Sequence, residues 1–129
     1  MLWRGAAMLQ EWIEPYINKV GQGLRSPGNN SYTRNLSVAL NYAFKDQVED
    51  KKPVLFVLLH RNHYGLYSVM MSGEAYSSYP SEGEMLIVEG SMVKILGTEE
   101  DVQINNKHES LKEYFTKKVM VVYLYLDFA

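Results

Sequence analysis

Two long apolar runs constrain the fold of this 129-residue chain more than any other feature. The first extends from Pro53 to Leu59 and the second from Val119 to Leu126, and neither contains a charged residue. Successive side chains of a strand point to opposite faces of a sheet, so a strand that is apolar throughout must be covered on both faces. Both runs are far shorter than the roughly 20 residues that span a bilayer. They therefore predict central strands of a sheet that is packed on both sides.

The first third of the chain is patterned for one strand and two helices. Met1 to Ala6 is a short apolar run that predicts a strand. A stripe at helical spacing follows, and we expect its helix to kink at Pro15 or to begin close to it, because proline has no N–H to donate. A second amphipathic helix is predicted after Asn35, whose side chain suits an N-cap. The stripe residues are Leu9, Trp12, Ile13, Tyr16, Ile17 and Val20 in the first helix and Leu36, Ala39, Leu40, Ala43 and Phe44 in the second.

The remaining segments predict loops and further strands. Gly21 to Asn30 is rich in Gly, Pro and Asn, which predicts a loop that ends at Ser31-Tyr32-Thr33. Met85 to Val88 and Met92 to Leu96 flank Glu89-Gly90-Ser91, a pattern that is typical of a β-hairpin. A charged turn is predicted at Lys45 to Lys52, a strand at Gly65 to Met71 and a tyrosine-rich loop at Ser72 to Ser81. Glu109 to Lys117 predicts a short helix with Leu111, Tyr114 and Phe115 facing inward.

Composition argues against several classes of protein. Thirteen Lys and Arg against fifteen Asp and Glu leave a net charge of -2, so the chain lacks the basic excess that neutralises nucleic-acid phosphates. The absence of cysteine excludes disulfide frameworks and cysteine-zinc clusters. His60 and His63 have no acidic partner nearby in the sequence, which predicts a surface turn and no metal site. With no visible secretory signal or membrane-spanning segment, we expect a soluble single domain over 1–129 with no nucleic-acid or membrane partner.

Three polar features remain, and each has a structural and a functional interpretation. Arg4 is a lone cation in an apolar strand and needs an anion, either a neighbouring carboxylate or a ligand phosphate. Ser31 and Thr33 precede a helix, so their hydroxyls either cap that helix or belong to a site. Glu82 and Glu84 are two residues apart, so on an extended chain both carboxylates point the same way, roughly 6.5 to 7 Å apart. They form either a solvated charged turn or a pair that divides labour in one cleft.

The order and spacing of these features resemble the mono-ADP-ribosyltransferases of the arginine, serine, glutamate class. The matching segments are Leu2-Trp3-Arg4-Gly5, the Ser-x-Thr element leading into Val38-Ala39-Leu40-Asn41-Tyr42-Ala43, and Tyr79-Pro80-Ser81-Glu82-Gly83-Glu84-Met85-Leu86. Together with the two apolar runs, the resemblance covers nearly the whole chain. Members of this family usually carry a helical lobe ahead of the arginine strand. We expect this chain to lack that lobe, because it begins almost at the strand.

The resemblance implies NAD as co-substrate and assigns residues to it. Arg4 corresponds to the arginine that holds the NAD phosphates. Ser31 corresponds to the serine that organises the nicotinamide-ribose pocket, and Thr33 supports the turn beside it. Tyr67 belongs to a tyrosine-rich region that covers NAD in the family, where one ring stacks on nicotinamide. Ordinary packing is the alternative for these tyrosines.

The resemblance also implies the residues that carry the reaction. Glu84 corresponds to the glutamate that hydrogen-bonds the nicotinamide ribose and stabilises the oxocarbenium-like transition state. Glu82 corresponds to the glutamate that engages an acceptor arginine. Tyr79 occupies a position that often helps to recognise the target protein.

The fold and function that we expect follow from this resemblance. The fold is α+β, with two packed and mainly antiparallel sheets flanked by helices. The reaction is transfer of ADP-ribose from NAD to an arginine of a target protein, with release of nicotinamide and without a metal. Two alternatives stay open. One is an NAD glycohydrolase, in which water replaces arginine at the same site, and the other is a non-catalytic binding or structural module.

Overall fold

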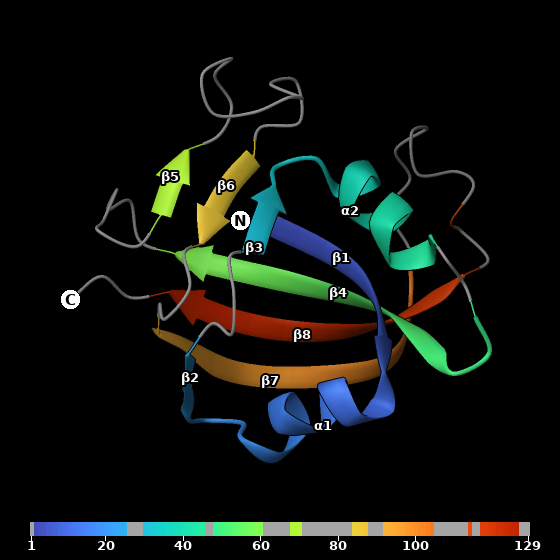
Figure 1. Cartoon of the computed structure of the whole chain (residues 1–129), viewed down its shortest axis with the longest axis horizontal. Coiled ribbons are helices and arrows are strands. Elements are labelled where there is room, and N and C mark those ends of the chain that lie inside the picture. Colours follow the sequence, from blue (N-terminus) through green and yellow to red (C-terminus); the bar gives the residue numbers. More distant parts are fainter. Residues whose placement is uncertain are drawn as a thin grey trace.

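One eight-stranded sheet carries the strands of the described chain, and two helices pack on it (Figure 1). In this computed structural model the described residues are 2–25, 30–45, 48–60, 68–70, 84–87, 92–104, 114 and 117–126. The strand order is β2-β7-β8-β4-β1-β3-β6-β5, in which β4 and β8 are parallel and every other neighbouring pair is antiparallel. The elements are β1 (Leu2–Leu9), α1 (Gln10–Asn18), β2 (Gly23–Arg25), β3 (Asn30–Thr33), α2 (Leu36–Phe44), β4 (Lys51–His60), β5 (Ser68–Met70), β6 (Glu84–Ile87), β7 (Met92–Gln103) and β8 (Lys118–Leu126).

The two apolar runs form β4 and β8 in the middle of the sheet, as predicted. Their side chains alternate between two apolar clusters. On one face, Phe56 of β4 packs with Ile13 of α1, and on the other face Leu55 packs with Leu40 of α2. Each fully buried side chain of this kind contributes roughly 1.5–3 kcal/mol of hydrophobic stabilisation. The two helices therefore cover opposite faces of one sheet, which explains why neither central strand tolerates a polar face.

The prediction of two packed sheets is wrong, and the pairing of one short strand explains the difference. β3 joins β1 through a single pair of residues, Trp3 opposite Thr33, whereas four consecutive pairs join β3 to β6. This contact makes β3, β6 and β5 a continuation of the sheet rather than a second layer. Figure 1 shows these three strands crossing the direction of β1 and β4. The mainly antiparallel pairing and the flanking helices agree with the prediction.

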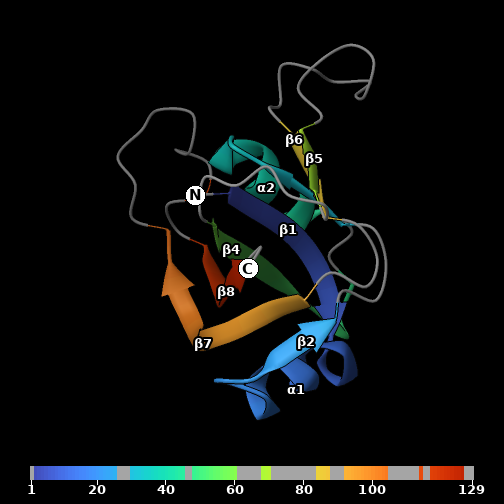
Figure 2. The ribbon, with the colours of Figure 1, turned by 90° about the vertical axis from the view of Figure 1, so that its left-hand side faces the viewer.

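Two local predictions are also wrong. β6 pairs with β3 and β5, whereas β7 pairs with β2 and β8, so the two do not form the expected hairpin. The expected loop over Gly21 to Asn30 contains β2, which adds to the edge of β7 near α1 (Figure 2). The N–H of Gly21 donates to the carbonyl of Ile95 at 2.7 Å, and the N–H of Ile95 donates to the carbonyl of Gln22 at 2.9 Å. These bonds join segments far apart in the chain, which local turn signals do not reveal.

Both predicted helices are present, although α1 is shorter than its stripe, and Trp12 and Val20 of that stripe are exposed. α1 begins at Gln10 and continues through Pro15, with Ile13 fully buried. α2 begins after Asn35, whose Oδ1 accepts a hydrogen bond from the N–H of Ser37 at 3.1 Å. This bond satisfies one of the free N–H groups of the first turn and confirms the predicted N-cap.

Gly5 allows α2 to lie directly against β1. A Cβ at this position would lie 1.6 Å from the carbonyl oxygen of Ala39 and 2.8 Å from the backbone nitrogen of Ala43. No side chain larger than hydrogen fits there unless the helix moves, because both atoms belong to the backbone of α2. Since Gly5 follows Arg4 in β1, this close approach of α2 to the sheet lies next to the lone cation of that strand.

The later predictions fall partly on described residues. β5 lies inside the predicted strand Gly65 to Met71, and Tyr114 is buried, as predicted for the short helix. The ring of Tyr114 stacks on Phe44 of α2, with 5.6 Å between ring centroids, and its hydroxyl donates to Oδ1 of Asn41. The predicted loop Ser72 to Ser81 and the rest of the short helix lie outside the described residues.

Candidate functional site

Three neighbouring strands carry the predicted motif residues. Arg4 lies in β1, Ser31 and Thr33 lie in β3, and Glu84 is the first residue of β6. β3 stands between the other two strands, with Thr33 opposite Trp3 of β1 on one side and opposite Glu84 on the other. The backbone register therefore brings three motifs that are far apart in sequence to one region of the sheet.

Arg4 is a partly buried cation that rests on an aromatic ring. Its Cζ lies 5.0 Å from the centroid of Phe56, the residue directly opposite it in β4. The ring of Tyr16 packs edge-to-face with the same ring, with 5.2 Å between ring centroids and an interplanar angle of 63°. Among the residues whose side chains the structure describes, no carboxylate lies within 4.0 Å of the guanidinium, so the structural ion pair considered for Arg4 is not found there. The positive charge of Arg4 therefore contacts the ring of Phe56 and solvent.

A pocket of about 460 Å³ opens beside Arg4. This volume lies within the range of small-molecule sites. The lining combines two cations from different strands, Arg4 and Arg25, with a single carboxylate, Glu11. The pocket therefore attracts anions more than cations. The lining residues come from β1, α1, β2 and β3 and are Arg4, Met8, Glu11, Trp12, Pro15, Tyr16, Leu24, Arg25 and Asn30.

The tyrosines beside Arg4 are uncharged at neutral pH. Burial raises the pKa of Tyr16, and the positive charge of Arg4 offsets part of this rise. Burial also raises the pKa of Tyr32 well above its ordinary value, again with a partial offset from Arg4. A neutral phenol both donates and accepts hydrogen bonds. Tyr16 therefore lines the pocket as a neutral side chain.

Tyr32, rather than Ser31, shares a face of the sheet with Arg4. Tyr32 packs in the same cluster as Phe56, whereas Thr33 stands opposite Trp3, which packs against the cluster under α2. Because side chains alternate along a strand, Ser31 lies on the face of Thr33, and Ser31 is exposed.

The hydroxyl of Thr33 has a structural role at the start of α2. Its Oγ1 accepts a hydrogen bond from the N–H of Asn35 at 3.0 Å. This bond orders the turn between β3 and the helix. The role of Thr33 beside the nicotinamide-ribose pocket, which the family resemblance implies, stays a prediction.

Several predicted residues lie beyond what the structure describes. Glu82, Tyr67 and Tyr79 are outside the described residues, and Glu84 is placed by its backbone alone, so their roles stay predictions. His63 is outside the described residues as well. Within the described ranges, no three His, Asp or Glu side chains gather into a group that could hold a metal ion. Neither α1 nor α2 has the length and apolarity needed to cross a membrane.

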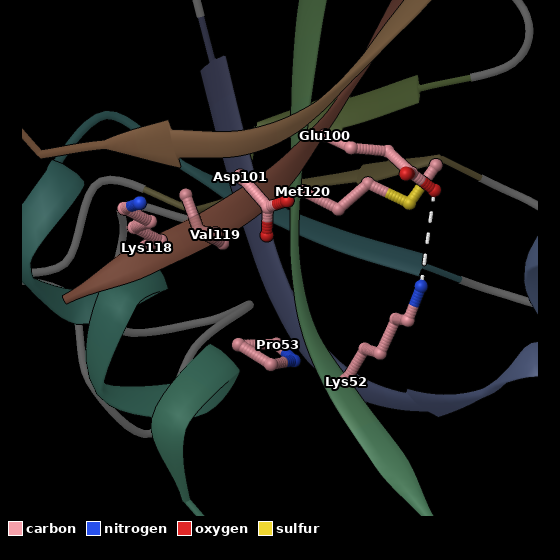
Figure 3. A pocket seen from close by; sticks show the side chains of 7 residues that line it. All are labelled: Lys52, Pro53, Glu100, Asp101, Lys118, Val119 and Met120. Carbon is pink, nitrogen blue, oxygen red and sulfur yellow. Dashed lines mark ion pairs between the residues drawn. The ribbon is translucent and has the colours of Figure 1, made fainter.

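A second pocket, of about 140 Å³, lies where β4 and β8 begin beside an irregular part of β7 (Figure 3). Its charges already compensate one another, because Lys52 faces Glu100 with 3.8 Å between Nζ and Oε1, and both side chains are about half exposed. An exposed pair of this kind is worth at most about 1 kcal/mol. The smaller size and the internal charge balance make this pocket the weaker candidate. It is lined by Lys52, Pro53, Glu100, Asp101, Lys118, Val119 and Met120.

Sequence reasoning missed four residues of the larger pocket, namely Trp12, Tyr16, Arg25 and Asn30. The first two were assigned to the apolar stripe of a helix, yet Trp12 is 47 % exposed and lines the pocket. In the sequence, this pocket surface is indicated only by Trp12, a large aromatic residue at the edge of the apolar stripe of the first helix. Arg25 falls in a segment that was expected to be a loop, and its place depends on the pairing of β2 with β7.

Comparison with solved structures shows which known proteins share this architecture. The ADP-ribosyltransferase HopU1 of Pseudomonas syringae pv. Tomato DC3000 aligns with 97% of the chain at a TM-score of 0.62 and 16% sequence identity. The ADP-ribosyltransferase Vis of Vibrio splendidus, in complex with an inhibitor, aligns with 97% of the chain at 0.63 and 19% identity. The Salmonella SpvB ATR domain aligns with 97% at 0.54 and 11% identity. The chain has the ADP-ribosyltransferase fold. No sequence-family model and no curated protein sequence matches it.

The chain is shorter than these structures. It spans 43% of the HopU1 structure, 47% of the Vis structure and 60% of the SpvB domain. The ADP-ribosyltransferase fold of this chain thus corresponds to a part of each of these proteins.

Proposed function

We propose that this chain transfers ADP-ribose from NAD to an arginine of a target protein and releases nicotinamide. The observation that carries the proposal is the environment of Arg4 in a chain with the ADP-ribosyltransferase fold. Arg4 is a partly buried guanidinium with no described carboxylate beside it, and it lines a pocket of about 460 Å³. A partly desolvated cation favours the binding of an anion, and the pyrophosphate of NAD is an anion of this kind.

The proposed chemistry places two carboxylates at the other end of the dinucleotide. The bond between the ribose carbon and nicotinamide breaks, its electron pair leaves with nicotinamide, and positive charge develops on the sugar. Glu84 stabilises this charge through a fixed electrostatic interaction. A guanidine nitrogen of the acceptor then bonds to the same carbon, and Glu82 takes the proton that the guanidinium must lose. Tyr79 contacts the target protein.

The decisive experiment follows labelled NAD into proteins. We expect the wild-type chain to transfer the label to proteins of a cell extract, and Glu84→Gln to reduce the rate by about 10²–10³-fold, the usual loss of one preorganised electrostatic contact. Glu49→Gln removes an exposed carboxylate far along the chain from the motifs and serves as the matched control, with unchanged transfer. Label transfer that survives Glu84→Gln contradicts the assignment of Glu84.

A second substitution separates arginine transfer from hydrolysis. With Glu82→Gln, we expect arginine modification to be lost while cleavage of NAD continues. Hydrolysis uses water as the acceptor, so it does not need a carboxylate that takes a proton from a guanidinium. The measurement compares release of free nicotinamide with label on protein in the same reaction. Equal loss of both products contradicts the acceptor role of Glu82.

A further inference from the structure

We propose that Phe56 and Tyr16 are positioning residues, which hold the Arg4 guanidinium at the pocket without neutralising it. This inference rests on the proposed function, because it takes the pyrophosphate of a dinucleotide as the anion that Arg4 binds. It assigns a task to two residues that otherwise belong to the apolar core and to the stripe of α1.

The geometry joins three residues from three elements. Arg4 of β1 and Phe56 of β4 are register partners, so their side chains lie on the same face of the sheet. The guanidinium carbon lies 5.0 Å from the ring centroid, within the roughly 6 Å over which a cation is attracted to a ring face. Tyr16 of α1 packs edge-to-face with Phe56 and also lines the pocket.

An aromatic partner differs from a carboxylate in what it leaves available. A carboxylate would pair with the guanidinium in a two-pronged hydrogen-bonded contact and cancel its charge. A ring face attracts the charge but accepts no strong hydrogen bond, so the N–H donors of Arg4 remain available for phosphate oxygens. Of the residues whose side chains the structure describes, none places a carboxylate within ion-pair distance of Arg4, in agreement with this role.

The ring that supports Arg4 cannot move aside. Phe56 is fully buried in the central strand β4, between β8 and β1. Its other contacts are core side chains that pack at close to crystalline density, so a change of rotamer would open a cavity. Tyr16 adds an edge-to-face contact, the arrangement that aromatic pairs prefer. The guanidinium therefore rests on a fixed surface, which lowers the ordering cost of binding an anion.

The test uses ADP-ribose as the probe, because it carries the pyrophosphate and cannot undergo transfer. Phe56→Leu keeps an apolar side chain and removes the ring face. We expect binding by calorimetry to weaken about 2- to 30-fold, the range that corresponds to a cation–π contact of about 0.5–2 kcal/mol. In the transfer reaction the same substitution raises the KM for NAD and leaves kcat unchanged, because the chemical step belongs to other residues.

Two controls separate positioning from packing. Ile95→Val removes core volume from the same apolar cluster at a fully buried position without contact to Arg4, and should leave binding unchanged. On α1, Tyr16→Phe keeps the aromatic contact with Phe56 and should retain at least half of the affinity for ADP-ribose. Tyr16→Leu removes that contact and should retain less than half of this affinity. In the Arg4→Gln background, Phe56→Leu should have no further effect, because its partner is already gone.

The outcomes distinguish this inference from the proposed function. Equal binding by Phe56→Leu and Ile95→Val, or an undiminished effect of Phe56→Leu in the Arg4→Gln background, overturns the positioning role even where label transfer is intact. Wild-type binding of ADP-ribose that depends on Phe56, without label transfer from NAD, supports the positioning role and contradicts the transferase. Absence of ADP-ribose binding up to millimolar concentration overturns the positioning role.

Discussion

Replacing Gly5 by alanine is the sharpest test of how α2 is seated on the sheet. The added Cβ would lie 1.6 Å from the carbonyl oxygen of Ala39, about 1.8 Å short of an ordinary contact at 3.4 Å. The obstructing atoms belong to the helix backbone, so no side-chain rotation relieves the clash. α2 must therefore withdraw, and this loosens the burial of Ala39, Leu40 and Ala43. Overpacking of about 1–3 kcal/mol and partial exposure of Leu40 together predict a loss of about 3–5 kcal/mol.

This loss is a large share of the roughly 5–15 kcal/mol that stabilises a typical domain, and for 129 residues it corresponds to a fall in Tm of roughly 11–18 °C. Thermal and urea denaturation followed by circular dichroism measure it. Gly97→Ala is the matched control, because a Cβ at Gly97 meets nothing within 4 Å and its φ is not in the left-handed region. The control should stay within about 0.5 kcal/mol of wild type. Equal stability of the two variants would refute the close approach of α2 to β1.

Three further outcomes are expected. Asn35→Ala should lower the free energy of unfolding by about 1 kcal/mol in urea titrations, whereas Asn35→Asp keeps the cap and most of the stability. The pKa of Tyr32 is raised by folding, so the folded state retains its proton where the unfolded chain loses it. Stability is therefore complete below about pH 10 and falls at higher pH by up to about 1.4 kcal/mol per pH unit, and Tyr32→Phe should flatten this fall. Arg25→Gln should weaken ADP-ribose binding and reduce its dependence on salt, as measured by calorimetry at two ionic strengths.

The sequence predicted those elements whose evidence is local. β4 and β8 follow from apolar residues on both faces of an extended chain, and α2 follows from a cap and a helical stripe. β2 was missed because it has only three residues and includes Gly23, so its strand conformation depends on pairing with β7. The same distant pairing overturned the hairpin, since no turn signal shows which partner a strand will take.

The residues of the candidate site likewise fall into those that local sequence patterns indicate and those that only the tertiary structure places there. Arg4 could be singled out because an isolated charge in an apolar strand is costly, whatever surrounds it. Tyr16 and Trp12 could not be assigned to the pocket, since helical periodicity shows which face is apolar but not which neighbouring strand the margin of that face meets. The chemistry of Arg4 was thus visible in the sequence, while its aromatic support required the register of β1 with β4.

The narrow junction between β1 and β3 has a consequence for spacing. A single residue pair, Trp3 with Thr33, links the strand of the cation to the strands that follow it on that side of the sheet. With so short a ladder, hydrogen bonding between these two strands does little to resist a slip of register, and a slip of one residue exchanges the two faces of a strand. Thr33 is also held by the turn that leads into α2, where its Oγ1 accepts a hydrogen bond from the N–H of the N-cap residue Asn35. The separation of Arg4 from β6 is therefore set in part by the turn at the start of α2. A substitution that loosens this turn would first change the position of β3 and β6 relative to β1.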